Sequence, residues 1–190
     1  MFLTLSVLVG AVALVALVGV IGLLTYNRLM ALDQRCDTAF ADVDVQLKHR
    51  HNLIPGLVET VRGFAGHERG VLEEVTRARA GALRASGPDM RLDAETQLGQ
   101  SINTVLSVVE KYPELQASSH FRELRMELTD AENRITAARR FYNLAVDEYN
   151  ATLRQFPGNR IGGAVRLGRR KPFDIGIERV LLDEPVAIRF

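Results

Sequence analysis

The chain has 190 residues, of which 24 are Lys or Arg and 23 are Asp or Glu, giving a formal net charge of +1. This balance gives no support to bulk nucleic-acid binding, which needs an excess of positive charge. The single cysteine, Cys36, excludes an intrachain disulfide and a thiolate zinc site.

The first element expected is a transmembrane helix. Residues 1–27 contain no charged side chain, and Phe2 to Leu24 are almost entirely apolar. A helix rises ~1.5 Å per residue, so this run is long enough to cross the ~30 Å hydrocarbon core of a bilayer. A cleaved signal peptide is the alternative, but no Lys or Arg precedes the run, and its Ala-x-Ala match at Ala11 lies inside the apolar segment. We therefore predict a retained anchor over residues 1–26.

The charges that flank this anchor predict its orientation. Arg28 and Arg35 follow the apolar run closely, whereas the other side offers only the α-amino group. Positive flanking residues favour the cytoplasm. We therefore expect the N-terminus outside and the bulk of the chain in the cytoplasm.

A helical domain is expected over residues 27–157. Apolar residues at every third or fourth position predict a helix over about 29–64, with a polar gap near His51. No linker separates this helix from the anchor, so we expect one continuous helix. It should be kinked at Pro55, which has no N–H and clashes with the preceding turn. Gly63, Gly66 and Gly70 indicate the turn that follows.

Three more helices are expected from the same periodicity, over about 67–84, 90–111 and 119–156. A Gly-Pro turn and Tyr112–Pro113 separate them. In the last one, apolar residues alternate steps of three and four from Phe121 to Phe156, which amounts to five heptads. The expected fold is therefore all-α, with the transmembrane helix continuing into an antiparallel up-down bundle of four long helices.

The C-terminal segment, residues 158–190, is rich in Gly and Arg and is expected to be irregular or to contain a short strand; for Ile175–Phe190 a strand, an extended arm and disorder are the alternatives. A bundle of four members would return this tail to the membrane, where each basic residue contributes about 1 kcal/mol at an anionic surface. A bundle of three members would place it far from the membrane, and a solvated loop is the other alternative. The candidates for contact with the membrane surface are Arg166, Arg169, Arg170 and Lys171.

No motif for catalysis or metal binding is found. His49 and His51 would point about 200° apart on a helix, and Val71 occupies the position where a zincin motif starting at His67 needs its second histidine. The histidines are interpreted as surface or capping residues. No nucleophile elbow, P-loop or dinucleotide fingerprint occurs. We therefore expect no enzymatic activity, no cofactor, no metal and no small-molecule substrate.

Two polar clusters are candidates for a partner-binding or self-association face, because amphipathic helices with mixed charge recognise other helices. The alternative for each residue is intramolecular hydrogen bonding that fixes the register of the helices. The first cluster contains Asp44, Gln46, Lys48, Arg50 and Pro55. The second contains Glu132, Asn133, Arg139, Tyr142 and Asn143.

These segments resemble the LemA family. Residues 43–50 with 53–55 (VDVQLKHR and LIP) resemble its most distinctive motif, and residues 112–115 (YPEL) resemble its middle segment. Residues 132–135 and 139–143 (ENRI and RRFYN) resemble its last helix. The similarity runs over about 26–173, and the tail beyond is less typical. The resemblance implies a bacterial inner-membrane protein with its N-terminus outside and a cytoplasmic antiparallel helical bundle. It implies no reaction, cofactor or catalytic residue.

Two non-enzymatic functions fit these expectations. The first is a membrane-anchored scaffold or assembly protein that forms a homo-oligomer through its long helices. The second is an accessory or adaptor subunit of a membrane protease or envelope-stress complex. Both have the lipid bilayer as a partner, and the second adds other membrane proteins.

Overall fold

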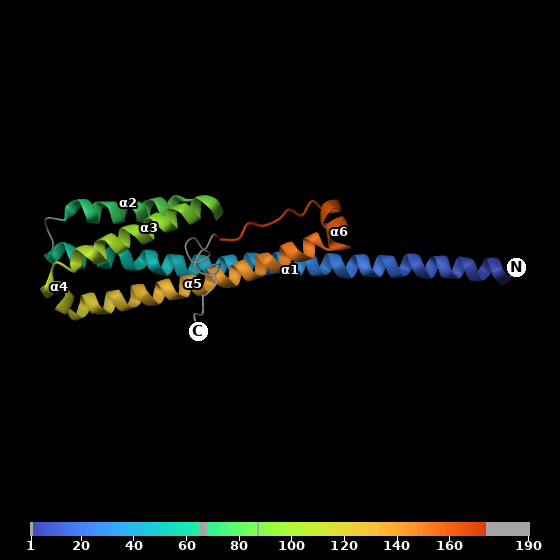
Figure 1. The fold of residues 1–190 in the computed structure, drawn as a ribbon, viewed down its shortest axis with the longest axis horizontal. Helices are drawn as coiled ribbons and strands as arrows, with labels where there is room; N and C mark the ends of the chain where they lie inside the picture. Colours follow the sequence, from blue (N-terminus) through green and yellow to red (C-terminus); the bar gives the residue numbers. More distant parts are fainter. Residues whose placement is uncertain (1, 65–67, 87, 174–190) are drawn as a thin grey trace, which may run out of the picture. The chain divides into compact units, whose positions relative to one another are not determined.

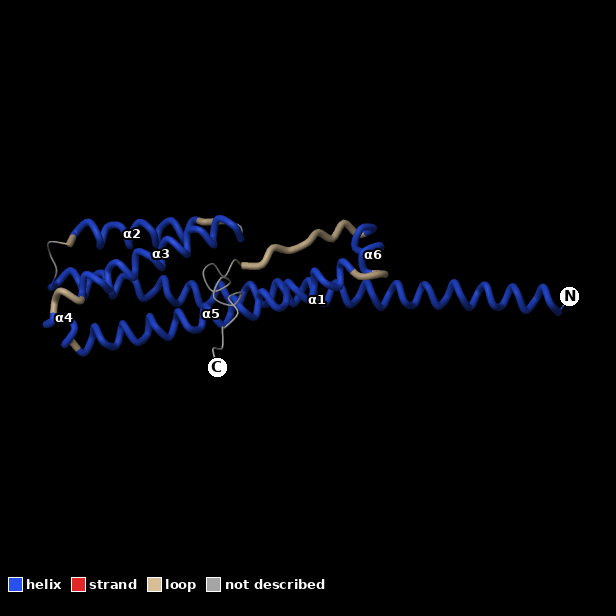
Figure 2. Tube along the Cα trace, viewed as in Figure 1, coloured by secondary structure: helices blue, strands red, loops and turns tan. Residues whose placement is uncertain are grey.

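The computed structural model describes residues 2–64, 68–86 and 88–173. Within these ranges every regular element is an α-helix (Figures 1 and 2), so the all-α prediction is confirmed there. The segment Ile175–Phe190, for which a short strand was one of the alternatives, lies outside the described residues. The helices are α1 (Phe2–Phe64), α2 (Arg69–Arg84), α3 (Pro88–Val109), α4 (Pro113–Ala117), α5 (Ser119–Arg154) and α6 (Gly158–Ala164).

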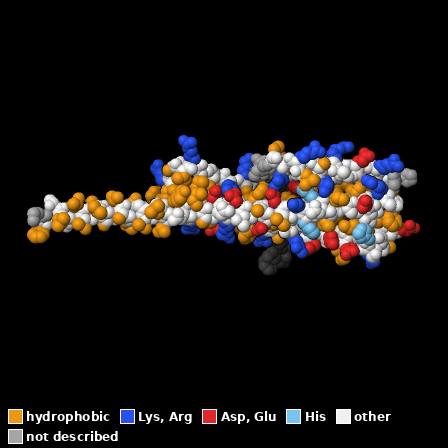
Figure 3. Space-filling view, turned by 180° about the vertical axis from the view of Figure 1, so that it is seen from behind, with side chains coloured by type: hydrophobic (Ala, Val, Ile, Leu, Met, Phe, Trp, Pro, Cys, Tyr) orange, Lys and Arg blue, Asp and Glu red, His pale blue; other side chains and the backbone are white. Residues whose placement is uncertain are grey.

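The apolar start of the chain and the first helix of the domain form one element. α1 continues through Pro55 and Gly63 without interruption and ends at Phe64. Its N-terminal part is long and apolar enough to cross a membrane, and none of its most apolar stretch is buried against the rest of the chain. Hydrophobic side chains line this part of α1 on the face shown in Figure 3. An uncovered apolar surface of this extent is what a bilayer accommodates.

The chain divides into two compact units, and α1 and α5 contribute to both. The first unit comprises Met1–Asp42 and Ala138–Pro172, and the second comprises Val43–Ala137 and Phe173–Phe190. Because the division falls inside two helices, it marks a change of packing partners and not a break in the backbone.

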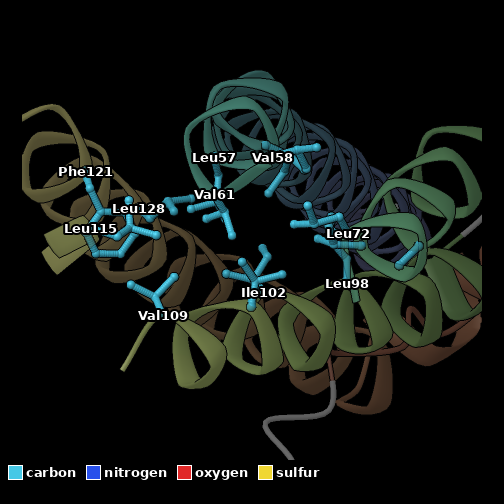
Figure 4. Close-up of a cluster of buried hydrophobic side chains, with 14 of the residues drawn as sticks. Leu57, Val58, Val61, Leu72, Leu98, Ile102, Val109, Leu115, Phe121 and Leu128 are labelled. Carbon is cyan, nitrogen blue, oxygen red and sulfur yellow. The ribbon is translucent and has the colours of Figure 1, made fainter. Parts of the chain in front are cut away.

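The core of the second unit is built where α1, α2, α3, α4 and α5 converge. α2 and α3 lie side by side (Figure 1), and their inward faces meet the apolar face of α1. Leu57 and Val61 of α1 and Leu98 of α3 have no exposed surface (Figure 4). Burying such a side chain contributes about 1.5–3 kcal/mol. The predicted apolar stripes are therefore what holds this unit together.

In the first unit, α1 and α5 run antiparallel. Arg35 of α1 pairs with Glu148 of α5, and five residues further along α1 the ring of Phe40 packs edge-on against Tyr142. The core between them begins at Leu29, which is fully buried only a few residues after the apolar run. The other buried apolar residues of this unit are Leu32, Cys36, Ala39, Tyr142, Ala145, Val146, Tyr149 and Leu153.

Two aromatic residues placed in the predicted stripes lie at the surface. Phe64 is 48% exposed and Phe156 is 81% exposed. α1 ends at Phe64, and α5 ends at Arg154, before the pattern reaches Phe156. A stripe position is buried only while the helix continues. The short helices α4 and α6 were not expected either; α4 begins with Pro113, a residue that favours the first position of a helix.

Candidate functional site: two clusters of polar contacts

The first cluster is centred on a buried arginine in the second unit. Arg50 of α1 is only 2% exposed. Its Nη2 donates to the Glu95 carboxylate of α3 at 2.5 Å, and its Nη1 donates to the Glu132 carboxylate of α5 at 2.7 Å. Glu95 is as deeply buried as Arg50, whereas Glu132 is half-exposed. One guanidinium therefore links three helices of the unit.

His51 shares the same carboxylate. Its Nε2 lies 2.9 Å from Oε1 of Glu95, an ion-pair distance, although the contact is not aligned as a hydrogen bond. Burial alone would raise the pKa of Glu95. The interactions with His51 and Arg50 outweigh burial, so the pKa of this carboxyl lies below its ordinary value. Glu95 is therefore held ionised inside the unit.

An arginine of α2 supplies a hydrogen bond that the proline at position 55 cannot make. Proline has no N–H, so the carbonyl of residue 51, four positions earlier, lacks its helical hydrogen bond. Arg79 donates from Nε to this carbonyl oxygen of His51 at 2.8 Å. The partly buried acceptor is thereby satisfied, and α1 passes through Pro55 without losing a hydrogen-bond partner at this point.

A small cavity of about 220 Å³ lies next to this cluster, and Asp44, Lys48, His51, Arg91 and Glu95 are among the residues that line it. A histidine beside a carboxylate is the arrangement of a general base. Here both carboxylates are already paired, Asp44 with Arg91 and Glu95 with Arg50. In the described ranges, no group of three or more His, Cys, Asp or Glu residues could hold a metal ion.

The second cluster, in the first unit, holds the chain that follows α6 against α5. The Tyr149 hydroxyl donates to the carbonyl of Gly168 at 3.0 Å, and the Tyr142 hydroxyl donates to that of Lys171 at 3.2 Å. Between them, Asn150 donates to the carbonyl of Arg170 at 2.8 Å and accepts from its N–H at 3.0 Å. Residues 168–171, named here the strap, are thus fixed through their backbone.

Arg170 ties the strap to α1. Its Nε donates to Asp33 at 2.8 Å and its Nη1 donates to Asp37 at 2.6 Å. Burial would lower the pKa of Arg170, but these two carboxylates outweigh burial and raise it. The guanidinium also lies over the ring of Tyr149, with 5.9 Å to its centroid. Burial raises the pKa of the Cys36 thiol on the same face of α1, so less of it is present as thiolate.

The two polar clusters that were predicted from the sequence, one on α1 and one on α5, are in contact through the Arg50–Glu132 ion pair. Asp44 is also paired, and Tyr142 and Asn143 are buried. Contacts of this kind within the chain are what the alternative to partner binding describes. Of the other candidates, Gln46 and Arg139 are partly exposed, and Lys48, Pro55 and Asn133 are exposed.

The four candidates for membrane contact differ in their surroundings. Arg166, Arg169 and Lys171 are exposed. Arg170 is held by Asp33 and Asp37.

Two further residues correct the sequence interpretation. His51 is 5% exposed, so it is neither a surface nor a capping histidine. Glu95 was not singled out, although it lies three residues before Leu98 and seven before Ile102, on the apolar stripe of α3. A carboxylate in a stripe, facing the polar gap at Arg50 and His51, is the signal that would have found the cluster. Arg79 and Asp33 carry no comparable signal.

Comparison with known proteins assigns the chain to a family. The sequence matches the LemA family over residues 39–190. The magnetosome proteins MamQ 1 and MamQ 2 of Paramagnetospirillum magneticum are each 21% identical, over 86% of this chain and 69% of their own length. Protein LemA of Metamycoplasma hominis is 24% identical, over 83% of this chain and 73% of its own. Since the family match covers most of the chain, this membrane-associated helical protein belongs to the LemA family.

Proposed function

We propose that this protein is a non-enzymatic scaffold or assembly protein of the bacterial inner membrane. Its N-terminus lies outside, and its domain, an antiparallel bundle of four long helices, lies in the cytoplasm. The observation that carries the proposal is the continuity of α1, which passes from an uncovered apolar segment into the buried residue Leu29 without a linker. A helix built this way fixes a folded domain directly to the bilayer.

Self-association is the second part of the proposal. α5 carries three large apolar side chains that the packing within the two units leaves at least partly uncovered, and exposed apolar surface of this kind often marks an interface. We propose that copies of the chain associate through this helix. The exposed residues are Met126 (67%), Phe141 (46%) and Leu144 (60%).

The test of self-association is the mass of the full-length protein. Purified into detergent or nanodiscs, it should be a homo-oligomer by light scattering at micromolar concentrations. Replacing Leu144 with Ser should shift it toward the monomer, whereas the same change at Val45, which is 61% exposed on α1, should not. A monomer at every concentration would contradict this part of the proposal.

The orientation is tested by C-terminal fusions of the full chain. A green fluorescent protein fusion should be fluorescent and an alkaline phosphatase fusion inactive, because the domain is proposed to lie in the cytoplasm. The opposite pair of results would show that the positive residues after the anchor do not set its orientation.

An adaptor function is the alternative, and the exposed residues Lys48 and Asn133 favour it by leaving a polar face for a different protein. A photo-crosslinking residue at position 48 of the membrane-inserted protein discriminates between the two functions. Capture of a second copy of this chain supports the scaffold, whereas reproducible capture of one membrane protease or stress-response protein supports the adaptor.

A further inference from the structure

The end of α5 lies beside the end of the apolar segment of α1. In the first unit Arg35 pairs with Glu148, and the two helices run antiparallel. Moving six residues forward from Glu148 to Arg154, the last residue of α5, corresponds to moving six residues back from Arg35 to Leu29, because both helices rise by ~1.5 Å per residue. Phe156 follows two residues after α5, close to the level at which the apolar run meets the first charged residue, Arg28.

The chain after α5 folds back tightly at this level. A Cβ at Gly158 would collide with the carbonyl oxygen of Thr152, and one at Gly162 would collide with the side chain of Leu153. At position 158 the neighbour is backbone and only glycine fits, whereas at position 162 the Leu153 side chain would have to move. The segment is thus held as a compact turn, and Phe156 is left 81% exposed at its tip.

The C-terminus of α6 is closed by a Schellman arrangement. The N–H of Leu167 donates to the carbonyl of Gly162 at 2.9 Å, and Arg166 between them adopts φ = 59°. Glycine is the usual residue at this left-handed position, and an L side chain costs about 1–2 kcal/mol there. The arginine at position 166 therefore adds charge to the turn and no conformational stability.

The charged side chains on this turn and on the nearby part of α1 are all positive. Residues 1–32 and 149–173 contain no Asp or Glu. Arg154, Arg160 and Arg166 are exposed on the turn, and Arg28 is exposed on α1. Figure 3 shows basic side chains beside hydrophobic ones where α6 lies. An exposed aromatic residue among arginines, close to the level of the end of a membrane-spanning segment, fits the interface of an anionic bilayer.

We propose that residues 154–166, named here the interfacial turn, form a second contact with the membrane. Phe156 inserts at the level of the lipid headgroups, and Arg154, Arg160 and Arg166 bind the phosphate groups of anionic lipids in the same leaflet. The inference rests on the proposed membrane anchoring of α1. The interfacial turn then fixes the base of the domain to the bilayer at a second point.

The test uses the absence of tryptophan from the chain. A Phe156→Trp variant of the full-length protein carries one fluorophore at the tip of the turn. In nanodiscs that contain phosphatidylglycerol, its emission should be blue-shifted and quenched by lipids brominated near the headgroup. The matched control is Val45→Trp, on α1 in the second unit and 61% exposed, which should be neither shifted nor quenched. Equal quenching of both variants, or of neither, would overturn the proposal.

A third tryptophan variant distinguishes failure of the interfacial contact from failure of the membrane anchoring of α1. Val12→Trp places the fluorophore within the apolar part of α1 and should be quenched by lipids brominated deep in the acyl chains. If Val12→Trp is quenched and Phe156→Trp is not, the anchor stands and the second contact is wrong. If Val12→Trp is not quenched, the anchoring itself is wrong.

The choice of anionic lipid is tested in the Phe156→Trp background. Replacing Arg154, Arg160 and Arg166 with Glu should abolish the blue shift and the quenching in phosphatidylglycerol nanodiscs. The same reversal at the exposed residues Arg122, Arg125 and Arg134 of α5 should leave both unchanged. Quenching of equal strength in purely zwitterionic nanodiscs, or quenching that survives the first reversal, would overturn the role of anionic headgroups.

Discussion

At the scale of single residues, the second unit depends on a carboxylate placed in its core. Glu95 occupies a position on an apolar stripe, yet it is ionised because Arg50 and His51 lie against it. Removing one partner of a buried ion pair costs about 3–5 kcal/mol, because the other charge is left without compensation in a poorly solvated site. Exposed pairs contribute about 0.2–1 kcal/mol. The two kinds of pair in this chain should therefore respond very differently to substitution.

Glu95→Gln should lower the free energy of unfolding by about 3 kcal/mol, since it leaves the buried Arg50 guanidinium with only the half-exposed Glu132 as an ionised partner. Urea denaturation of the full-length protein in detergent, followed by circular dichroism, measures this change. The control is Asp130→Asn, which breaks an exposed pair with Arg134 on α5 and should cost less than about 1 kcal/mol. Equal effects of the two substitutions would mean that the cluster is not a stabilising element.

The contribution of Glu95 should also depend on pH. Folding lowers the pKa of this carboxyl below 4.5, so its ionised form favours the folded state. This stabilisation is complete above the pKa of the unfolded chain and is lost as the pH falls through the lower pKa of the folded protein. The difference in unfolding free energy between wild type and Glu95→Gln should therefore shrink on acidification below 4.5. A difference that is independent of pH would contradict the assignment.

At the scale of elements, α1 is unusual because it continues through a proline. Arg79 supplies a donor to the His51 carbonyl that Pro55 leaves without a partner. The contact comes from a different helix, so it couples the path of α1 to the position of α2. A hydrogen bond of this kind from a charged donor contributes about 1.5–3 kcal/mol.

A double-mutant cycle tests this coupling. Arg79→Met should be destabilising in the wild type and much less so in a Pro55→Ala background, where residue 55 again donates its N–H within the helix. The coupling energy should be about 1 kcal/mol or more in unfolding measurements. Arg77→Met, at an exposed position of α2, should show no coupling with Pro55→Ala. Additive effects of Arg79→Met and Pro55→Ala would mean that Arg79 does not replace the helical bond.

The strap is a second element whose stability can be measured locally. Arg170→Gln removes both ion pairs with Asp33 and Asp37, so residues 165–172 should open more often. Tryptic cleavage after Arg166 should become about tenfold faster, the effect of losing roughly 1.4 kcal/mol of local stability. Arg169→Gln removes a neighbouring exposed arginine and should leave this cleavage rate unchanged. If both variants are cleaved equally fast, Arg170 does not hold the strap.

Element boundaries were predictable because the signals for them are local. The C-terminus of α2 and the N-terminus of α5 fall where the periodicity and the turn residues placed them, and the expected end of α3 at residue 111 is two residues beyond the observed one. The pairings were not predictable. Arg50 and Glu95 are 45 residues apart, and Arg170 and Asp33 are 137 apart. Nothing local to either residue specifies such a partner; only the packed helices bring the charges together.

At the scale of the whole molecule, α1 and α5 each supply residues to both compact units. Unfolding of one unit therefore disrupts helices on which the other unit depends. The uncovered apolar segment of α1 is different, because the buried core of the first unit starts only at Leu29. That segment contributes attachment to the membrane, and the domain does not need it for its own packing.

Deletion of residues 1–26 should consequently release the protein from the membrane without unfolding it. The truncated chain should move from the membrane pellet to the supernatant on ultracentrifugation and keep a helical circular dichroism spectrum. Its residual affinity for anionic vesicles should be weak, since the interfacial turn alone lacks the hydrophobic energy of a spanning helix. A truncated chain that stays in the pellet and resists extraction with alkaline carbonate would contradict the assignment of the anchor.

The unbroken passage from Asn27 to Leu29 also makes the junction sensitive to helical phase. One extra residue there would rotate the anchor by about 100° relative to the core face of α1, whereas seven extra residues would rotate it by only about 20°. A flexible tether would tolerate either insertion. In this protein the number of residues between the membrane and the core determines which side of the anchor faces the interfacial turn. Insertions should therefore preserve that orientation only when their length is close to a whole number of helical turns.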